Sequence, residues 1–435
     1  MTHCAMMRRR SGAGTFLGLH HHPHRRRIRG HGYFKRLGPG IVTGAADDDP
    51  SGIGTYSQVG AAYGLGLLWF VPLVAPMAAA VQETAGRLGL VTGQGLATLI
   101  RRDFSRWVLT GALLLVILAN TFNIAADVAA MAGSTRLVID LPQTVLVFVY
   151  VAMMMTLELT MPYHRYARVL RWLALSLLAY VFVLASANVD WGAVWSSLVS
   201  PSLVGGAGGI AALIAVFGTT VSPYLFFWQA SEEVEEETDR HDPVDVEHVR
   251  AMRIDVIGGM VSAVLIAFAI VVVAASTLHP AGITTIATPD QAAQALEPLV
   301  GRAAGLVFTL GIVGLGLLSV PVLAGSTAYA VAETFDWHEG LSERLRDARG
   351  FYAVVAASML TGTLVNLVGL DPIRALYLAA ILNGLAAPPL IALMLILGRR
   401  DRTLGRFRSG AWSLGVVGAT LLVSIGLPIA YLAAR

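Results

Sequence analysis

Three consecutive aspartates, Asp47 to Asp49, interrupt an apolar segment of this 435-residue chain. Charged side chains at membrane depth are costly, and they usually mark an ion or substrate pathway. Pro50 follows the aspartates and cannot continue a helical hydrogen-bond ladder, while Gly52, just after Ser51, tolerates unwound backbone. Unwound backbone survives in lipid only where it is buried in protein or lines a cavity. The segment therefore predicts one half of a transport site.

A second interruption is expected between Gly218 and Phe227, in another apolar segment. Pro223 lies in its middle, directly after Ser222, which suits an interrupted helix. Pro223 alone is also compatible with a simple kink. Inverted-repeat transporters carry broken helices in matching places of their two halves. The pairing with the Asp49 segment therefore favours a binding site over a kink.

Composition places the chain among polytopic membrane proteins, because 55% of its residues are hydrophobic and only 14% are charged. Its single cysteine, Cys4, excludes a disulfide framework and a cysteine-based metal centre. The sequence contains no His-Glu-x-x-His motif, P-loop or nucleophile elbow. We therefore expect neither an enzyme nor a self-contained ATP-driven pump, with no cofactor and no nucleic-acid partner.

Hydropathy predicts about eleven transmembrane helices. The apolar stretches of spanning length fall at residues 38–62, 66–90, 106–135, 143–162, 166–187, 208–231, 253–277, 303–331, 351–369, 372–398 and 411–433.

Because the two broken spans are the first and the sixth, the order predicts an all-α LeuT-type five-plus-five inverted repeat. We expect repeat one at 38–187, repeat two at 208–398 and an extra helix at 411–433, within one transmembrane domain at 37–435. Residues 1–36 are basic and are predicted to form a disordered cytoplasmic tail.

Arginines alternate between the connections, which predicts the orientation of the chain. The even-numbered connections and their flanks carry the clusters, namely Arg87, Arg101, Arg102, Arg106, Arg165, Arg168, Arg171, Arg344, Arg346, Arg349, Arg399, Arg400, Arg402, Arg406 and Arg408. The odd-numbered connections hold only scattered single arginines. The N-terminus is therefore expected in the cytoplasm and the C-terminus outside, and a bacterial inner membrane is the expected location.

The two interruptions resemble those of the NRAMP (natural resistance-associated macrophage protein) family over roughly the first ten helices. Gly38-Pro39-Gly40 leading into Asp49 to Thr55 is similar to a first helix that reads Asp-Pro-Gly-Asn where it unwinds. Ser222-Pro223-Tyr224 is similar to the family's Met-Pro-His. Further similar segments are Gln82 with Arg87 to Gly93, and Ala126-Asp127-Val128-Ala129 with Gly133.

The resemblance implies a transition-metal site made by the family's aspartate, asparagine and methionine and a backbone carbonyl. Carried over, Asp49 matches the aspartate, and Gly52 stands where the asparagine would be. Ser222 replaces the methionine, and Thr219 is the matching carbonyl donor. Metal ligation is therefore expected around Asp49, with an altered set of neighbours.

The same resemblance implies a changed proton route. Tyr224 replaces the family's histidine, Asp127 matches an acidic residue on the route, and Ala130 stands where the family usually has a glutamate. We therefore predict that proton coupling is weakened or lost.

The departures at the metal site favour harder ions. A methionine thioether favours soft and borderline metals, whereas a serine hydroxyl is a hard oxygen ligand, so Ser222 should weaken discrimination against Mg²⁺. Neighbours on a helix point about 100° apart, so the three aspartates cannot all face one ion. Asp49 is ranked first as ligand and Asp48 second. In the alternative interpretation, Asp47 and Asp48 cap the broken helix or face a vestibule.

Asn383, in the tenth span ahead of Pro388 and Pro389, is a further oxygen candidate. The family uses a tenth-helix glutamine, but an ungapped match anchored on the prolines puts Ala380 there. A helix–helix hydrogen bond is the competing role for Asn383.

The leading interpretation is a secondary transporter that moves divalent metal cations by alternating access, with membrane lipid around it. One alternative keeps the fold and changes the cargo to a small organic solute. Another is an Mg²⁺-dependent intramembrane prenyl transferase, for which a second Asp-rich motif is lacking.

Overall fold

The structure is a computed structural model that describes residues 43–44, 46–160, 178–186, 189–240, 244–297, 301–341, 343–366 and 371–435. These residues all belong to one unit, Leu37–Arg435. The predicted tail at 1–36, the start of the first span and most of the fifth span lie outside the described residues.

The first span is broken immediately before Pro50, as predicted. Residues 46–47 are helical, Asp48 lies in a turn, and Asp49 precedes helix α2 (Pro50–Tyr63). Pro50 occupies the first helical position, where its missing N–H removes no intrahelical bond and its fixed φ suits the helix. The proline therefore begins the second half of the span.

The sixth span is interrupted in the same way. Helix α10 (Gly206–Thr220) is followed by Val221, whose φ of −114° and ψ of 58° are not helical. Helix α11 (Pro223–Arg240) begins directly after Ser222. Both predicted interruptions are therefore present, and each ends with a proline that opens a new helix.

The remaining helices fall where hydropathy places spans or connections. The longer ones are α3 (Phe70–Thr92), α5 (Arg106–Thr135), α6 (Gln143–Thr160), α12 (Val246–Thr277), α15 (Ala304–Phe335), α16 (Arg349–Asn366), α17 (Pro372–Arg399) and α19 (Ala411–Ala433). Shorter ones are α4 (Leu96–Asp103), α8 (Leu178–Ser186), α9 (Trp191–Val199), α13 (Pro289–Ala293) and α18 (Asp401–Leu404). Seven helices within the described ranges are long and apolar enough to cross a membrane, counting the α10–α11 pair as one.

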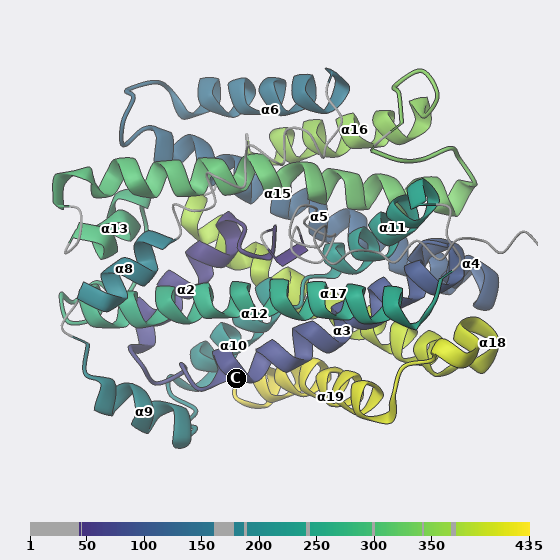
Figure 1. Ribbon diagram of the computed structural model, residues 1–435. Helices are drawn as coiled ribbons and strands as arrows, with labels where there is room; N and C mark the ends of the chain where they lie inside the picture. The colour runs from purple at the N-terminus through teal and green to yellow at the C-terminus, as the bar shows by residue number, and fades with distance from the viewer. Residues whose placement is uncertain are drawn as a thin grey trace, which may run out of the picture. The chain divides into compact units, whose positions relative to one another are not determined.

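The broken spans lie inside the bundle. Helix α2 contacts α12, α17 and α10, and Figure 1 shows α6 and α16 lying over α5 and α15. In the most apolar stretch of 18 residues of the α10–α11 span, 94% of the residues are buried. The corresponding share for α19 is 17%. The two interruptions are thus surrounded by protein, which is where unwound backbone is tolerated.

Helices α10 and α17 approach closely because both carry glycine at the contact. A Cβ on Gly218 would lie 2.0 Å from the Ala380 carbonyl oxygen and 2.3 Å from the Gly384 nitrogen. Small residues allow helix backbones in membranes to approach each other in this way. This contact fixes α10, and with it Thr219, against the helix that carries Asn383.

Ion pairs join even-numbered connections to one another. Arg101 pairs with Asp336 at 2.9 Å, linking the segment after α3 to the segment after α15. Arg400, which follows α17, pairs with Asp103 of α4 at 2.7 Å. Burial acts to raise the pKa of Asp103, but hydrogen bonds and charge from Arg102 and Arg400 hold it below its ordinary value.

Two odd-numbered connections contact the span ends next to the first connection. The Trp69 indole, at the start of α3, donates to the Ser202 carbonyl oxygen at 3.0 Å. The Gln58 amide, near the end of α2, donates to the Thr284 carbonyl oxygen at 3.1 Å. In these four contacts, even-numbered connections meet even-numbered ones and odd-numbered connections meet the span ends next to the first connection.

Candidate metal site

Asp49 caps helix α2 with one carboxylate oxygen. Its Oδ1 accepts a hydrogen bond from the Gly52 backbone N–H at 2.9 Å and from the Ser51 hydroxyl at 2.5 Å. A carboxylate at a helix N-terminus is stabilised by these otherwise unpaired N–H groups and by the helix dipole. Asp49 is only 1% exposed, and these two hydrogen bonds offset part of the cost of burying its carboxylate.

The other oxygen of Asp49 has weaker partners. Oδ2 lies 3.4 Å from the Tyr224 hydroxyl and 3.5 Å from the Asn123 amide nitrogen. The Tyr224 hydroxyl has a shorter partner in the Ala46 carbonyl oxygen, at 2.9 Å. Because one phenolic proton is shared between these acceptors, Oδ2 is the less satisfied oxygen and the better placed one for a cation.

The C-terminal end of α10 adjoins this cap. The Thr219 hydroxyl lies 3.2 Å from the Ser51 hydroxyl. Ser51 already donates its proton to Asp49, so Thr219 is the donor of this pair. Hydrogen bonds from Thr219 to Ser51 and from Ser51 to Asp49 thus join the two broken spans.

Ser222 lies in the interruption itself, where its hydroxyl binds back to α10. It is 2.9 Å from both the Gly218 and the Thr219 carbonyl oxygens. A donating hydroxyl keeps its two lone pairs, and a carbonyl oxygen has two of its own. The Ser222 hydroxyl and the Thr219 carbonyl are hydrogen-bonded to each other, and both oxygens still have a lone pair that can bind a metal ion.

The other aspartates of the triplet do not cap the helix. Asp48 lies in the turn before Asp49 and is 4% exposed. Asp47 is 1% exposed, and its Oδ1 has no hydrogen-bond partner among the residues that the structure describes. The prediction that Asp47 or Asp48 caps the broken helix is therefore wrong for α2, because Asp49 is its N-cap, while a position facing a vestibule stays a prediction.

Gly52 contributes its N–H to the cap and has no side chain to offer an ion. A Cβ here would lie 3.3 Å from a ring carbon of Tyr56 and 3.5 Å from the Thr219 hydroxyl. The space that an asparagine side chain needs is thus bounded by Tyr56 and Thr219.

Asn383 of α17 is fully buried, beside the close contact with α10. Neither atom of its amide has a hydrogen-bond partner within the described ranges. Asn383 therefore does not form the predicted alternative, a helix–helix hydrogen bond, with any described residue. Its amide oxygen and nitrogen are both left unpaired there.

Asp127 of α5 is fully buried and is held by α15. Its Oδ2 accepts from the Ser319 hydroxyl at 3.2 Å, while Oδ1 has no partner in the described part of the chain. No hydrogen bond from Asp127 to Tyr224 or Asp49 is present among the described contacts. The two predicted proton-route residues, Asp127 and Tyr224, are therefore not joined by a hydrogen bond in the described part of the chain.

Sequence reasoning missed two buried asparagines on α5. Asn120 donates to the Thr327 hydroxyl at 2.9 Å, and Asn123 donates to Asp49. Together with Asp127 they follow the spacing i, i+3 and i+7, which places polar side chains on one helix face. That spacing inside an apolar span was a readable signal.

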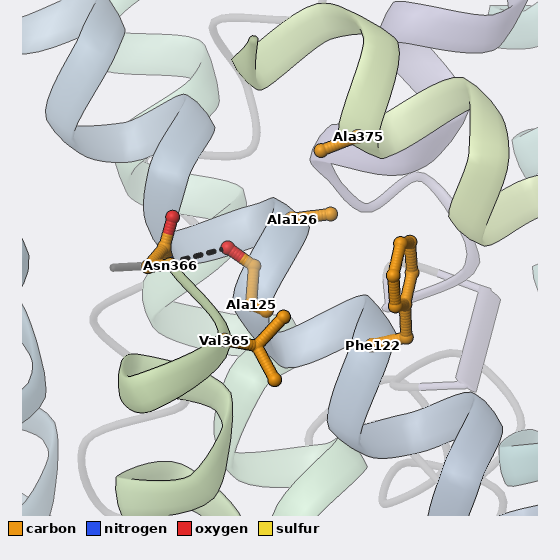
Figure 2. Close-up of a pocket in the computed structure, with 6 residues that line it drawn as sticks. All are labelled: Phe122, Ala125, Ala126, Val365, Asn366 and Ala375. Atoms are coloured by element: carbon orange, nitrogen blue, oxygen red, sulfur yellow. Dashed lines mark hydrogen bonds between the residues drawn. The ribbon is translucent and has the colours of Figure 1, made fainter. Parts of the chain in front are cut away.

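A small pocket lies between α5, α16 and the start of α17 (Figure 2). Its lining is mainly apolar, and the Asn366 amide donates to the Ala125 carbonyl oxygen at 2.7 Å beside it. None of the predicted ligand residues lines this pocket. Likewise, no three His, Cys, Asp or Glu side chains gather as a metal site among the residues described. The candidate metal ligands are instead the Asp49 carboxylate and the hydroxyl, carbonyl and amide oxygens near it.

The described residues form an all-α polytopic membrane protein with LeuT-type architecture, so the predicted fold class is confirmed. The chain belongs to the natural resistance-associated macrophage protein-like family, which it matches over residues 40–434.

Individual proteins agree with this assignment. The divalent metal cation transporter MntH of Pectobacterium carotovorum is 28% identical, with 90% of this chain and 92% of that protein covered. A structure of the Eremococcus coleocola manganese transporter superposes with a TM-score of 0.72 at 19% identity, covering 92% of this chain and 87% of that one. A structure of MhsT with L-phenylalanine gives a TM-score of 0.61 at 15% identity, covering 92% and 98%. At these identities, the two solved structures show that the fold is similar and nothing more.

Proposed function

We propose that this protein is a secondary transporter that carries divalent metal cations across the membrane by alternating access at Asp49. The family and the named function of its relatives support divalent metal transport. The observation that carries the site is the meeting of both broken spans at one buried carboxylate. Half-helices that move around such a midplane site expose it alternately to each side. Neither an organic cargo nor prenyl transfer is favoured by any of these observations.

Asp49 is the principal ligand in this proposal, through Oδ2. The Thr219 carbonyl and the Ser222 hydroxyl add neutral oxygens from the end of α10. The last carbonyls of a helix lack intrahelical partners and lie at its negative end, which suits a cation. Asp48 and Asn383 are proposed as additional oxygen ligands, which the ion contacts when the half-helices move. Gly52 serves the site through its backbone alone.

This donor set favours hard cations. One carboxylate with neutral oxygens and retained water suits Mg²⁺ and Mn²⁺, whereas a site without thioether or thiolate gains nothing special from Cd²⁺. We infer that the protein discriminates weakly against Mg²⁺.

Proton movement accompanies transport only weakly in this proposal. A phenol does not change its charge between pH 5 and 8, whereas an imidazole does, so Tyr224 cannot take over the role of a histidine. Asp127 lies near Asp49 and interacts with the Ser51 backbone N–H, but it makes no direct hydrogen bond to Asp49 among the described residues, and Ala130 cannot titrate.

The orientation is proposed with the N-terminus in the cytoplasm and the C-terminus outside, in a bacterial inner membrane. The pairing of even-numbered connections with each other, and of odd-numbered ones with the span ends next to the first connection, supports the alternation on which this orientation rests. Exposed apolar side chains such as Leu118, Leu265 and Leu422 offer the surface that lipid would cover. The proposed domain organisation is a tail at 1–36, repeats at 38–187 and 208–398, and an extra helix at 411–433.

The test is uptake of metal by the full chain in proteoliposomes. Entry of ⁵⁴Mn²⁺ down its gradient should saturate and should require Asp49. Equal uptake by protein-free vesicles would contradict the proposal.

A further inference from the structure

Asn123 of α5 is a buried amide whose oxygen is unused. The side chain is fully buried, and its Oδ1 has no hydrogen-bond partner among the described residues. Leaving a buried polar atom unpaired costs about 1–3 kcal/mol. The Oδ1 of Asn120 on the same helix is unpaired as well, so what distinguishes Asn123 is its position next to Asp49.

The amide lies beside Oδ2, the less satisfied carboxylate oxygen of Asp49. Asn123 Nδ2 is 3.5 Å from Asp49 Oδ2, while Oδ1 of Asp49 is already occupied by Ser51 and Gly52. An amide carries donors on one side and an acceptor on the other. Its terminal torsion is broad and roughly two-fold, so a half-turn exchanges nitrogen for oxygen at the same place.

We propose that Asn123 supplies its amide oxygen as a ligand to the divalent cation bound at Asp49, an inference that rests on the proposed function. Without a cation, Nδ2 donates to the carboxylate. With a cation on Oδ2, the amide turns and presents Oδ1. One side chain thereby satisfies the site in both states.

The position also accounts for what Gly52 lacks. Where the family's first-helix motif has an asparagine, this chain has no side chain, and Tyr56 and Thr219 limit the space. Asn123 approaches the same carboxylate from α5 and brings an amide oxygen from a different helix. An amide oxygen is a hard ligand, so this contact should matter more for Mg²⁺ than for Cd²⁺.

The experiment compares Mg²⁺ and Cd²⁺ uptake by the full chain in proteoliposomes. Asn123→Ala should raise the KM for Mg²⁺ about tenfold, equivalent to about 1.4 kcal/mol. The KM for Cd²⁺ should change by about twofold or less, because a soft ion depends less on the lost oxygen. Asn123→Asp keeps an oxygen and should retain Mg²⁺ uptake.

Asn120→Ala is the matched control, since Asn120 is equally buried three residues earlier and binds Thr327 rather than Asp49. It should leave both KM values near those of the unmodified protein. Asn123→Leu, which nearly preserves volume, replaces the alanine variant if that variant does not fold.

Two results would overturn the inference while leaving the proposed function intact. One is Asp49-dependent Mg²⁺ uptake that Asn123→Ala does not alter. The other is an equal loss for Mg²⁺ and Cd²⁺, matched by Asn120→Ala, which would mark a structural role only. Metal uptake that does not depend on Asp49 would remove the proposed site and this inference together.

Discussion

The Tyr224 hydroxyl lies 3.4 Å from Oδ2 of Asp49, so the sixth span reaches the carboxylate of the first. The same hydroxyl is 2.9 Å from the Ala46 carbonyl oxygen, on the other side of the first break. Tyr224 thus holds both halves of the first span while satisfying Oδ2 only partly. A cation arriving at Oδ2 meets an oxygen whose existing contacts are long.

Ser222→Met should move selectivity toward soft ions. A thioether replaces a hard hydroxyl oxygen and favours Cd²⁺ over Mg²⁺. We expect the ratio of Cd²⁺ to Mg²⁺ uptake to rise about tenfold, a change of about 1.4 kcal/mol in relative affinity.

The measurement is competition between the two ions in proteoliposomes, with Ser222→Ala as the control that removes the hydroxyl without adding sulfur. An unchanged ratio in the methionine variant would place Ser222 outside the ion's coordination.

Gly218→Ala should destabilise the protein. The added Cβ would lie 2.0 Å from the Ala380 carbonyl oxygen, so α10 and α17 must separate. Overpacking of this kind typically costs about 1–3 kcal/mol.

Thermal unfolding in detergent measures this effect. Gly258→Ala in α12 is the matched control, because nothing lies within 4 Å of its Cβ position. Equal melting temperatures for the two variants would contradict the close contact.

Asp127→Asn should leave metal uptake largely intact, because proton coupling is predicted to be weak. The unmodified protein should show little internal acidification during Mn²⁺ uptake, measured with a pH dye in the vesicle lumen. The reason is that the Tyr224 phenol stays protonated and neutral around pH 7, while Ala130 has no titratable group. Metal-dependent acidification that disappears in Asp127→Asn would show that the route is intact after all.

Glu339, in the segment after α15, should make stability fall as pH rises. Burial first, and then the charges of Glu333 and Glu235, raise the pKa of Glu339 to about 9 from its ordinary 4.5. Because the folded protein binds this proton more tightly than the unfolded chain, the stabilising contribution is complete below pH 4.5. It is lost progressively as the pH rises to about 9.

Glu339→Gln should therefore flatten the decline of melting temperature between pH 6 and 9, since an amide does not ionise. A decline of the same steepness in this variant would assign the pH dependence to other groups.

The broken helices were predictable because their cause is local. A proline after polar residues in an apolar span opens a new helix wherever it occurs, and Pro50 and Pro223 both do so. The alternation of arginines was equally readable, because it depends on counting connections rather than on packing.

The partners of Asp49 were predictable only in part. Thr219 and Tyr224 followed from the similarity of the two interruptions to a known pattern. Asn123 did not, since its contact with Asp49 depends on how α5 packs against the first span. The lack of a hydrogen bond from Asn383 was also unreadable, because it depends on which side chains face the amide.

A metal panel on reconstituted full-length protein, with Asp49→Ala beside it, tests the central claim most directly. Uptake of Mn²⁺, Cd²⁺, Mg²⁺ and Ca²⁺ is measured at equal concentrations for both proteins. The account predicts Asp49-dependent uptake in which Mg²⁺ competes with Mn²⁺ within about tenfold of its affinity. Uptake that persists in Asp49→Ala, or a strong preference for Cd²⁺ over Mg²⁺, would contradict it.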